Sequence, residues 1–189
     1  MILTAFRRGS DHTIRALYGM IVAQARSPVF YRTYGVPDTV QGRFDLLVLH
    51  LVLVLRRLDR DNEVASRSRF VNGRSLGQGL FDAFCRDLDG NLREMGVGDL
   101  AVPKEMQRFG EAYYGRQAAY RAAFAATDQR ELEKALARNI FDITVDERAT
   151  QLARYARAAA KQLDAEEEGA LTAAKMIFPD PESFADAPT

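Results

Sequence analysis

Several residue types that metal-binding and catalytic proteins rely on are scarce in this chain. The 189 residues include one cysteine, Cys85, and two histidines, His12 and His50. A single cysteine excludes an intramolecular disulfide and agrees with a reducing compartment. Two widely spaced histidines and one cysteine cannot form a standard zinc site without several carboxylates, and neither histidine has the Glu-x-x-His spacing of di-iron bundles. We therefore expect no metal and no cofactor.

Long apolar runs and a strong net charge are also absent. The longest apolar run, Leu46–Leu55, is followed by Arg56 and Arg57 and is far shorter than the roughly 20 residues of a membrane-spanning helix. The first eight residues are too short for a signal peptide, so we expect a cytoplasmic protein. The formal net charge of zero argues against DNA binding, which usually needs a basic excess.

Charge is nevertheless distributed unevenly along the chain. Residues 1–60 hold nine arginines against four aspartates. Such an imbalance suits an anionic membrane surface, where the protein would associate peripherally, or RNA. The simpler interpretation is a solvated helix face, and we prefer it.

Apolar residues recur at helical spacing through most of the chain and predict an all-α fold. We expect a single-domain bundle of about six helices, with a central apolar helix over residues 39–60 because that segment is apolar around its whole circumference. The other expected helices span residues 10–26, 75–95, 103–124, 128–140 and 144–166. Residues 1–27 form an amphipathic helix of the same domain as residues 28–168. Residues 169–189 form a C-terminal extension that we expect to be disordered after about residue 178.

Two short motifs resemble catalytic fingerprints, and their context argues against both. Residues 73–77 match GxSxG, but a nucleophile elbow needs a preceding strand and a later histidine, and both histidines precede Ser75. Residues 96–101 match GxGxxA, but that fingerprint must follow a strand, and here it follows a predicted helix. Cys85 falls on the apolar face of its helix and is expected in the core.

His50 is the one polar residue inside the apolar run. Buried histidines are usually bonded to a neighbouring carbonyl or carboxylate, and this is the interpretation we prefer. The alternative is a groove residue that contacts a ligand or partner, which would make the chain a helical small-molecule-binding protein or enzyme.

The segment from Leu80 to Tyr120 contains two charged helices that meet at Gly96–Pro103. Tyr113 and Tyr120 share the apolar stripe of the second helix, whereas Tyr114 and Arg116 lie off it. Tyr and Arg are favoured at protein interfaces, so we expect a surface that holds another protein. Its candidate residues are Arg93, Glu94, Lys104, Tyr114 and Arg116. For any single one of them, ordinary surface is the simpler interpretation and the one we prefer. Tyrosines with an arginine could also stack on RNA bases.

Several of these segments resemble the ubiquinol–cytochrome c chaperone family. The residues that carry the resemblance are Tyr34–Thr39, Phe44, Leu49–Leu51, Arg56–Leu58, Leu80–Asp82, Phe84, Asp87–Asp89, Arg93–Asp99 and Val102–Lys104. The resemblance covers roughly residues 28–160, and Met95–Gly98 with the following lysine is its most distinctive part.

The resemblance implies a non-enzymatic assembly factor for the cytochrome bc1 complex, respiratory complex III. Members bind newly made cytochrome b, with a small partner subunit and near the ribosome in mitochondria. The short segment before the first helix fits a bacterial member at the inner face of the cytoplasmic membrane; a eukaryotic member would be mitochondrial. The family supplies no catalytic residues. A ribosome- or RNA-binding module using the arginine-rich first third is the remaining alternative.

Overall fold

The computed structural model describes residues 2–66, 73–144, 147–167 and 169–185, and every regular element among them is helical. The elements are α1 (Ile2–Ala25), α2 (Pro28–Arg32), α3 (Val40–Ser66), α4 (Gly73–Glu94), α5 (Val102–Ala125), α6 (Arg130–Ile140), α7 (Glu147–Ala165) and the short 3-10 helix η1 (Pro181–Phe184). The predicted all-α fold is confirmed. The unpredicted α2 occupies the expected break after Ser27, and α1 begins well before Ser10.

The central helix is α3, as the sequence predicts. Every residue from Leu46 to Leu55 except Leu47 is buried. Helices α1, α4, α5, α6 and α7 all contact α3, which explains how an apolar surface on all sides of one cylinder is removed from water. Each fully buried leucine or valine contributes about 1.5–3 kcal/mol, so α3 is the main source of core burial.

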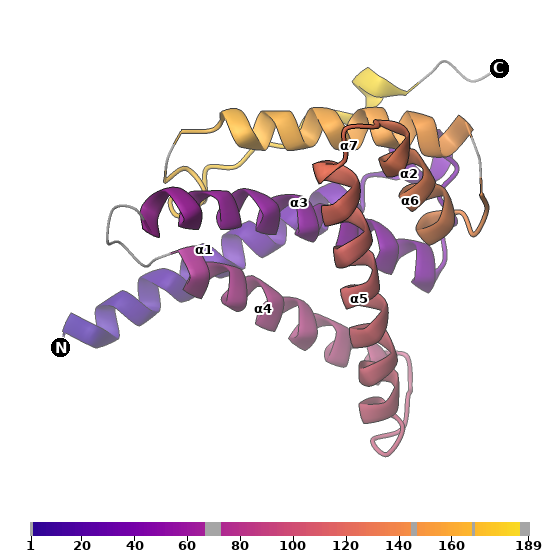
Figure 1. Ribbon diagram of the computed structural model, residues 1–189. Coiled ribbons are helices and arrows are strands. Elements are labelled where there is room, and N and C mark those ends of the chain that lie inside the picture. Colours follow the sequence, from indigo (N-terminus) through magenta and orange to yellow (C-terminus); the bar gives the residue numbers. More distant parts are fainter. Residues whose placement is uncertain (1, 67–72, 145–146, 168, 186–189) are drawn as a thin grey trace.

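Helices α4 and α5 form a V whose joint lies away from α7 and the chain ends (Figure 1). The amide of Val97 donates to the carbonyl of Leu92 at 3.0 Å, and that of Gly96 to Arg93 at 3.0 Å. Gly96 has φ +80°, so these bonds form the glycine cap expected at the end of α4. At the other end of α5, Asp128 Oδ1 accepts from the amide of Arg130 at 2.9 Å.

The C-terminal segment differs from the expected disorder, because residues 179–185 lie against the helices. The hydroxyl of Tyr34 donates to the carbonyl of Pro181 at 2.8 Å, and Gln24 Nε2 donates to that of Pro179 at 3.1 Å. Pro181 is buried, as is Met176 before it. From composition alone, this segment is a polar, proline-rich tail. Its hydrogen-bond partners lie more than a hundred residues earlier in the chain, so no local pattern reveals them.

A chain of hydrogen bonds joins α1, α7 and α3 inside the core. Gln24 Nε2 donates to the hydroxyl of Tyr155 at 3.0 Å, and Tyr155 lies 2.8 Å from Nε2 of His50. Nδ1 of His50 lies 2.7 Å from the carbonyl of Leu46. Because a carbonyl can only accept, Nδ1 carries the proton and Nε2 accepts from Tyr155. His50 is therefore the satisfied core histidine that we preferred at the sequence level.

Burial lowers the pKa of His50 to about 4 from its ordinary 6.5. The unfolded chain takes up this proton as pH falls through 6.5, whereas the folded chain resists it until about pH 4. Acid thus favours unfolding in this interval, and the neutral imidazole contributes its full stabilisation only above about pH 6.5.

We predict that the stability difference between wild type and the His50→Gln variant depends on pH. The excess free energy of unfolding of wild type should shrink by about 3 kcal/mol between pH 7 and pH 4, because only wild type has this histidine to protonate. Urea denaturation of both proteins across the pH range measures it. Parallel curves for the two proteins would show that His50 titrates normally in the folded state.

Candidate functional site

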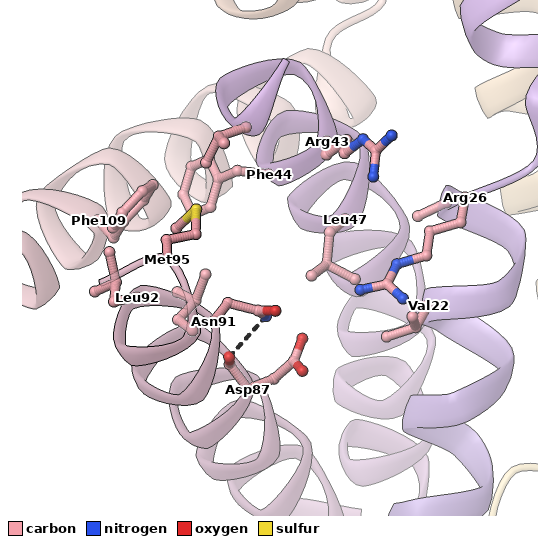
Figure 2. A pocket seen from close by; sticks show the side chains of 13 residues that line it. Val22, Arg26, Arg43, Phe44, Leu47, Asp87, Asn91, Leu92, Met95 and Phe109 are labelled. Atoms are coloured by element: carbon pink, nitrogen blue, oxygen red, sulfur yellow. Dashed lines mark hydrogen bonds between the residues drawn. The ribbon is translucent and has the colours of Figure 1, made fainter. Parts of the chain in front are cut away.

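An apolar groove opens between the end of α1, the start of α3, the end of α4 and the first turns of α5. Its volume is about 190 Å³, and Figure 2 shows the side chains that surround it. The lining residues are Val22, Ala25, Arg26, Val40, Arg43, Phe44, Leu47, Asp87, Leu88, Asn91, Leu92, Met95 and Phe109. We refer to this feature as the groove.

The floor of the groove is buried and its rim is exposed. The rings of Phe44 and Phe109 lie 4.8 Å apart between centroids, and both side chains are buried with Leu92. At the rim, Val40 is 54% exposed and Met95 is 51% exposed. Large apolar side chains at these exposures favour a site that a partner covers.

Charge is arranged asymmetrically around the groove. Arg26 and Arg43 lie on the α1–α3 side, and Asp87 and Asn91 lie opposite on α4 (Figure 2). Arg43 Nε pairs with Asp38 at 2.7 Å, and both side chains are more than half exposed. Asp87 accepts from the hydroxyl of Tyr18 at 2.9 Å, and burial together with this carboxylate raises the pKa of Tyr18.

Exposed apolar residues also occur on the V formed by α4 and α5. Six large apolar side chains are exposed among the described residues: Val40, Met95, Leu100, Tyr114, Ile143 and Ile177. Two of them, Val40 and Met95, line the groove. Leu100 is fully exposed in the α4–α5 joint, and Tyr114 is exposed on α5. We take the groove and the V together as one candidate surface, because both carry large exposed apolar side chains.

Four of the five predicted partner-binding residues are exposed on this surface. Arg93, Glu94 and Lys104 flank the joint, and Tyr114 is 59% exposed. Arg93 pairs with Asp89 at 2.8 Å and also contacts Asp99. Tyr113 and Tyr120 are buried, as their positions on the apolar stripe predict.

Arg116 occupies a different position from the one its sequence spacing suggests. Its side chain is 17% exposed, and Nε lies 2.6 Å from Oδ1 of Asp45, whose side chain is 3% exposed. The guanidinium also lies 5.5 Å from the centre of the Phe44 ring. Arg116 therefore fastens α5 to α3 beneath the groove and is not a free surface contact.

The Asp45 carboxylate is buried in the same part of the core. Burial raises its pKa to about 6, opposed by the charge of Arg116 and by a hydrogen bond from Gln41. Asp45 remains ionised at neutral pH, so the ion pair with Arg116 is intact there. The sequence hides this pair because Asp45 falls at the edge of the apolar run, far from Arg116.

Sequence reasoning also missed the α1–α3 wall of the groove. Val22, Val40 and Leu47 come from helices distant in sequence from the α4–α5 segment, so no local motif joins them. Amphipathic spacing indicated that α1 and α3 are helices but could not show which of their apolar residues a neighbouring helix leaves uncovered.

The described residues offer little support for catalysis or metal binding. No cluster of three or more His, Cys, Asp or Glu residues able to hold a metal ion occurs among them. The GxSxG segment starts α4, and the glycine of the GxGxxA segment caps its end. Cys85 is partly buried, and burial raises the pKa of its thiol, which disfavours the nucleophilic thiolate. No helix in the described ranges is both long and apolar enough to cross a bilayer.

These features define an all-helical protein with an apolar groove between α1, α3, α4 and α5. The sequence profile of the family described as ubiquinol-cytochrome C chaperone matches residues 32–178, and the chain belongs to this family. The predicted family is confirmed.

A solved structure agrees with this assignment. The crystal structure of the Cbp3 homolog from Brucella abortus is similar over 98% of this chain and 100% of that chain, with 35% sequence identity and a TM-score of 0.81. No protein in the curated comparison matches the sequence.

The Asp45–Arg116 pair generates a stability prediction. Arg116→Ala should lower the free energy of unfolding by about 3–5 kcal/mol, because it leaves a buried carboxylate without its counter-charge. Arg108→Ala is the matched control on the same helix, since Arg108 is exposed and pairs with the part-exposed Glu105 at 3.3 Å, a contact worth about 0–1 kcal/mol. Chemical denaturation at neutral pH compares them. Equal, small losses would contradict the structural role of Arg116.

Proposed function

We propose that this protein is a non-enzymatic assembly chaperone for the cytochrome bc1 complex that binds newly made cytochrome b. Membership of the ubiquinol–cytochrome C chaperone family supports the assembly role. The observation that supports client binding is the open apolar groove with its exposed rim of Val40 and Met95.

The chemistry of the client matches the chemistry of the groove. A newly made membrane protein exposes apolar segments that would otherwise aggregate. A chaperone must cover them and later release them, which favours a partly open surface of moderate affinity. Methionine suits such a surface because its flexible thioether adapts to differently shaped side chains.

The exposed polar residues beside the groove serve in this proposal as its rim. Arg93, Glu94 and Lys104 surround the joint, and Tyr114 offers a partly exposed ring whose centroid lies 6.0 Å from that of Phe81. Polar rim contacts contribute specificity more than affinity. Arg116 and His50 have no direct contact with the client in this proposal, because both are committed to the core.

The site of action follows from the client. Cytochrome b is inserted into the membrane as it is made, so its chaperone acts beside that membrane, at the cytoplasmic face in a bacterium. The ribosome and a small partner subunit are further candidate contacts that the same surface could serve.

In-cell photocrosslinking tests the proposal. We predict that a photoreactive residue at Met95 or Tyr114 captures cytochrome b, since both side chains would lie against the client. Ile177 is the matched control because it is 65% exposed and apolar but lies outside the groove lining and outside α4 and α5. Its crosslinking yield to cytochrome b should be clearly lower, because a photoreactive side chain captures only a partner that lies against it.

Two results would contradict different parts of the proposal. Capture of cytochrome b from Ile177 alone would show that the client binds elsewhere on this protein. Failure of all three positions to capture cytochrome b during active bc1 assembly would argue against cytochrome b as the client.

A further inference from the structure

Backbone groups at the helix ends that border the groove already have hydrogen-bond partners. At the end of α4, the carbonyls of Asn91, Leu92 and Arg93 already accept from the amides of Met95, Val97 and Gly96. At the end of α1, the carbonyl of Ala25 accepts from the hydroxyl of Tyr31 at 3.0 Å. At the start of α3, the amide of Gly42 donates to Thr39 Oγ1 at 3.1 Å.

This arrangement restricts the conformation of the occupant. An extended segment would bury its own amides and carbonyls against these walls without partners, at a cost for each unsatisfied group. A helix satisfies its backbone internally and presents apolar side chains three and four residues apart, which suits an apolar groove between helices. The groove therefore favours a helical segment.

The charges on the two sides of the groove restrict the occupant further. Arg26 is exposed and has no ion-pair partner among the described residues. The pair between Arg43 and Asp38 is exposed, and such pairs are weak enough to exchange partners. Asp87, on the opposite side, already accepts a hydrogen bond from Tyr18. A second pocket, lined by Arg26, Arg32 and Arg43 among others, adjoins the groove on the arginine side.

We infer that the groove takes an amphipathic α-helix of the client that places carboxylates against Arg26 and Arg43. The inference rests on the proposed chaperone function and specifies the class of segment recognised. Apolar side chains of the helix enter between Leu47 and Met95, and the carboxylates fix how the helix is seated. Recognition then combines an apolar face, which any unfolded client could supply, with a charge requirement that few segments meet.

Synthetic helical peptides test the inference with purified protein. Three fluorescent probes of about 18 residues, roughly five turns, share one apolar face. The acidic probe carries glutamates beside that face, the basic probe carries lysines there, and the third is the acidic probe with two central prolines that prevent helix formation. Fluorescence anisotropy at low and high salt gives each dissociation constant.

Wild type should bind the acidic probe about tenfold more tightly than the basic probe at low salt, and the preference should shrink as salt screens it. The proline probe should bind at least about tenfold more weakly than the acidic probe, because a non-helical chain leaves its backbone unpaired. The double variant Arg26→Glu/Arg43→Glu should reverse the charge preference.

The control variant Arg15→Glu/Arg130→Glu changes the net charge by the same amount. Both of its arginines are exposed and lie outside the groove. It should retain the preference for the acidic probe. Equal binding of the acidic and basic probes, or equal loss of preference in both double variants, would overturn the charge requirement. Undiminished binding of the proline probe would overturn the helical requirement.

The outcomes separate this inference from the proposed function. If the probes fail these comparisons while Met95 still captures cytochrome b in cells, the chaperone function stands and the inference is wrong. If the probes behave as expected but cytochrome b is not captured, the groove recognises acidic helices of a different client.

Discussion

The rest of the structure depends on covering α3, a helix that is apolar around its circumference. Five helices pack against it, and the buried stretch from Leu46 to Leu55 leaves no side of the cylinder to solvent except at Leu47. That cover is complete over the middle of α3 and opens at its first turns, where α1 ends and α4 diverges toward its joint with α5. The groove is the place where covering helices separate (Figure 2), so the candidate surface arises from the same packing that builds the core.

Polar groups inside this core hold the helices together. His50 connects α3 to Tyr155 of α7 and through it to Gln24 of α1. The pair between Asp45 and Arg116 connects α3 to α5 directly below Phe44. Buried polar pairs of this kind specify how neighbouring helices are aligned, because a misaligned core would leave each group unsatisfied. They keep the floor of the groove fixed while Met95 and Val40 at its rim remain exposed.

The helices were predictable from the sequence because their signals are local. Spacing within one helix predicts the apolar circumference of α3 and the buried stripe of Tyr113 and Tyr120. The glycine at position 96 marks the end of α4. The position of Arg116 and the ordered residues 179–185 were not predictable, because both depend on partners far away in the chain. The candidate surface divides in the same way. Residues beside the joint are neighbours in sequence and can be grouped from it, whereas Val22, Arg26 and Val40 come together only when α1 and α3 fold against α4.

Complementation of a strain that lacks this gene tests the central claim, that the groove serves assembly of the bc1 complex. Glutamates at the exposed positions Met95 and Val40 would place charge on the rim with little effect on folding, and glutamates at Ile143 and Ile177 make a matched control at exposed apolar positions outside the groove. The account predicts that wild type and the Ile143→Glu/Ile177→Glu variant restore assembled bc1 complex, measured by haem spectra and native gels. The Val40→Glu/Met95→Glu variant should not restore it, although other respiratory enzymes stay unchanged. Full restoration by the groove variant, or normal bc1 levels in the strain without the gene, would contradict it.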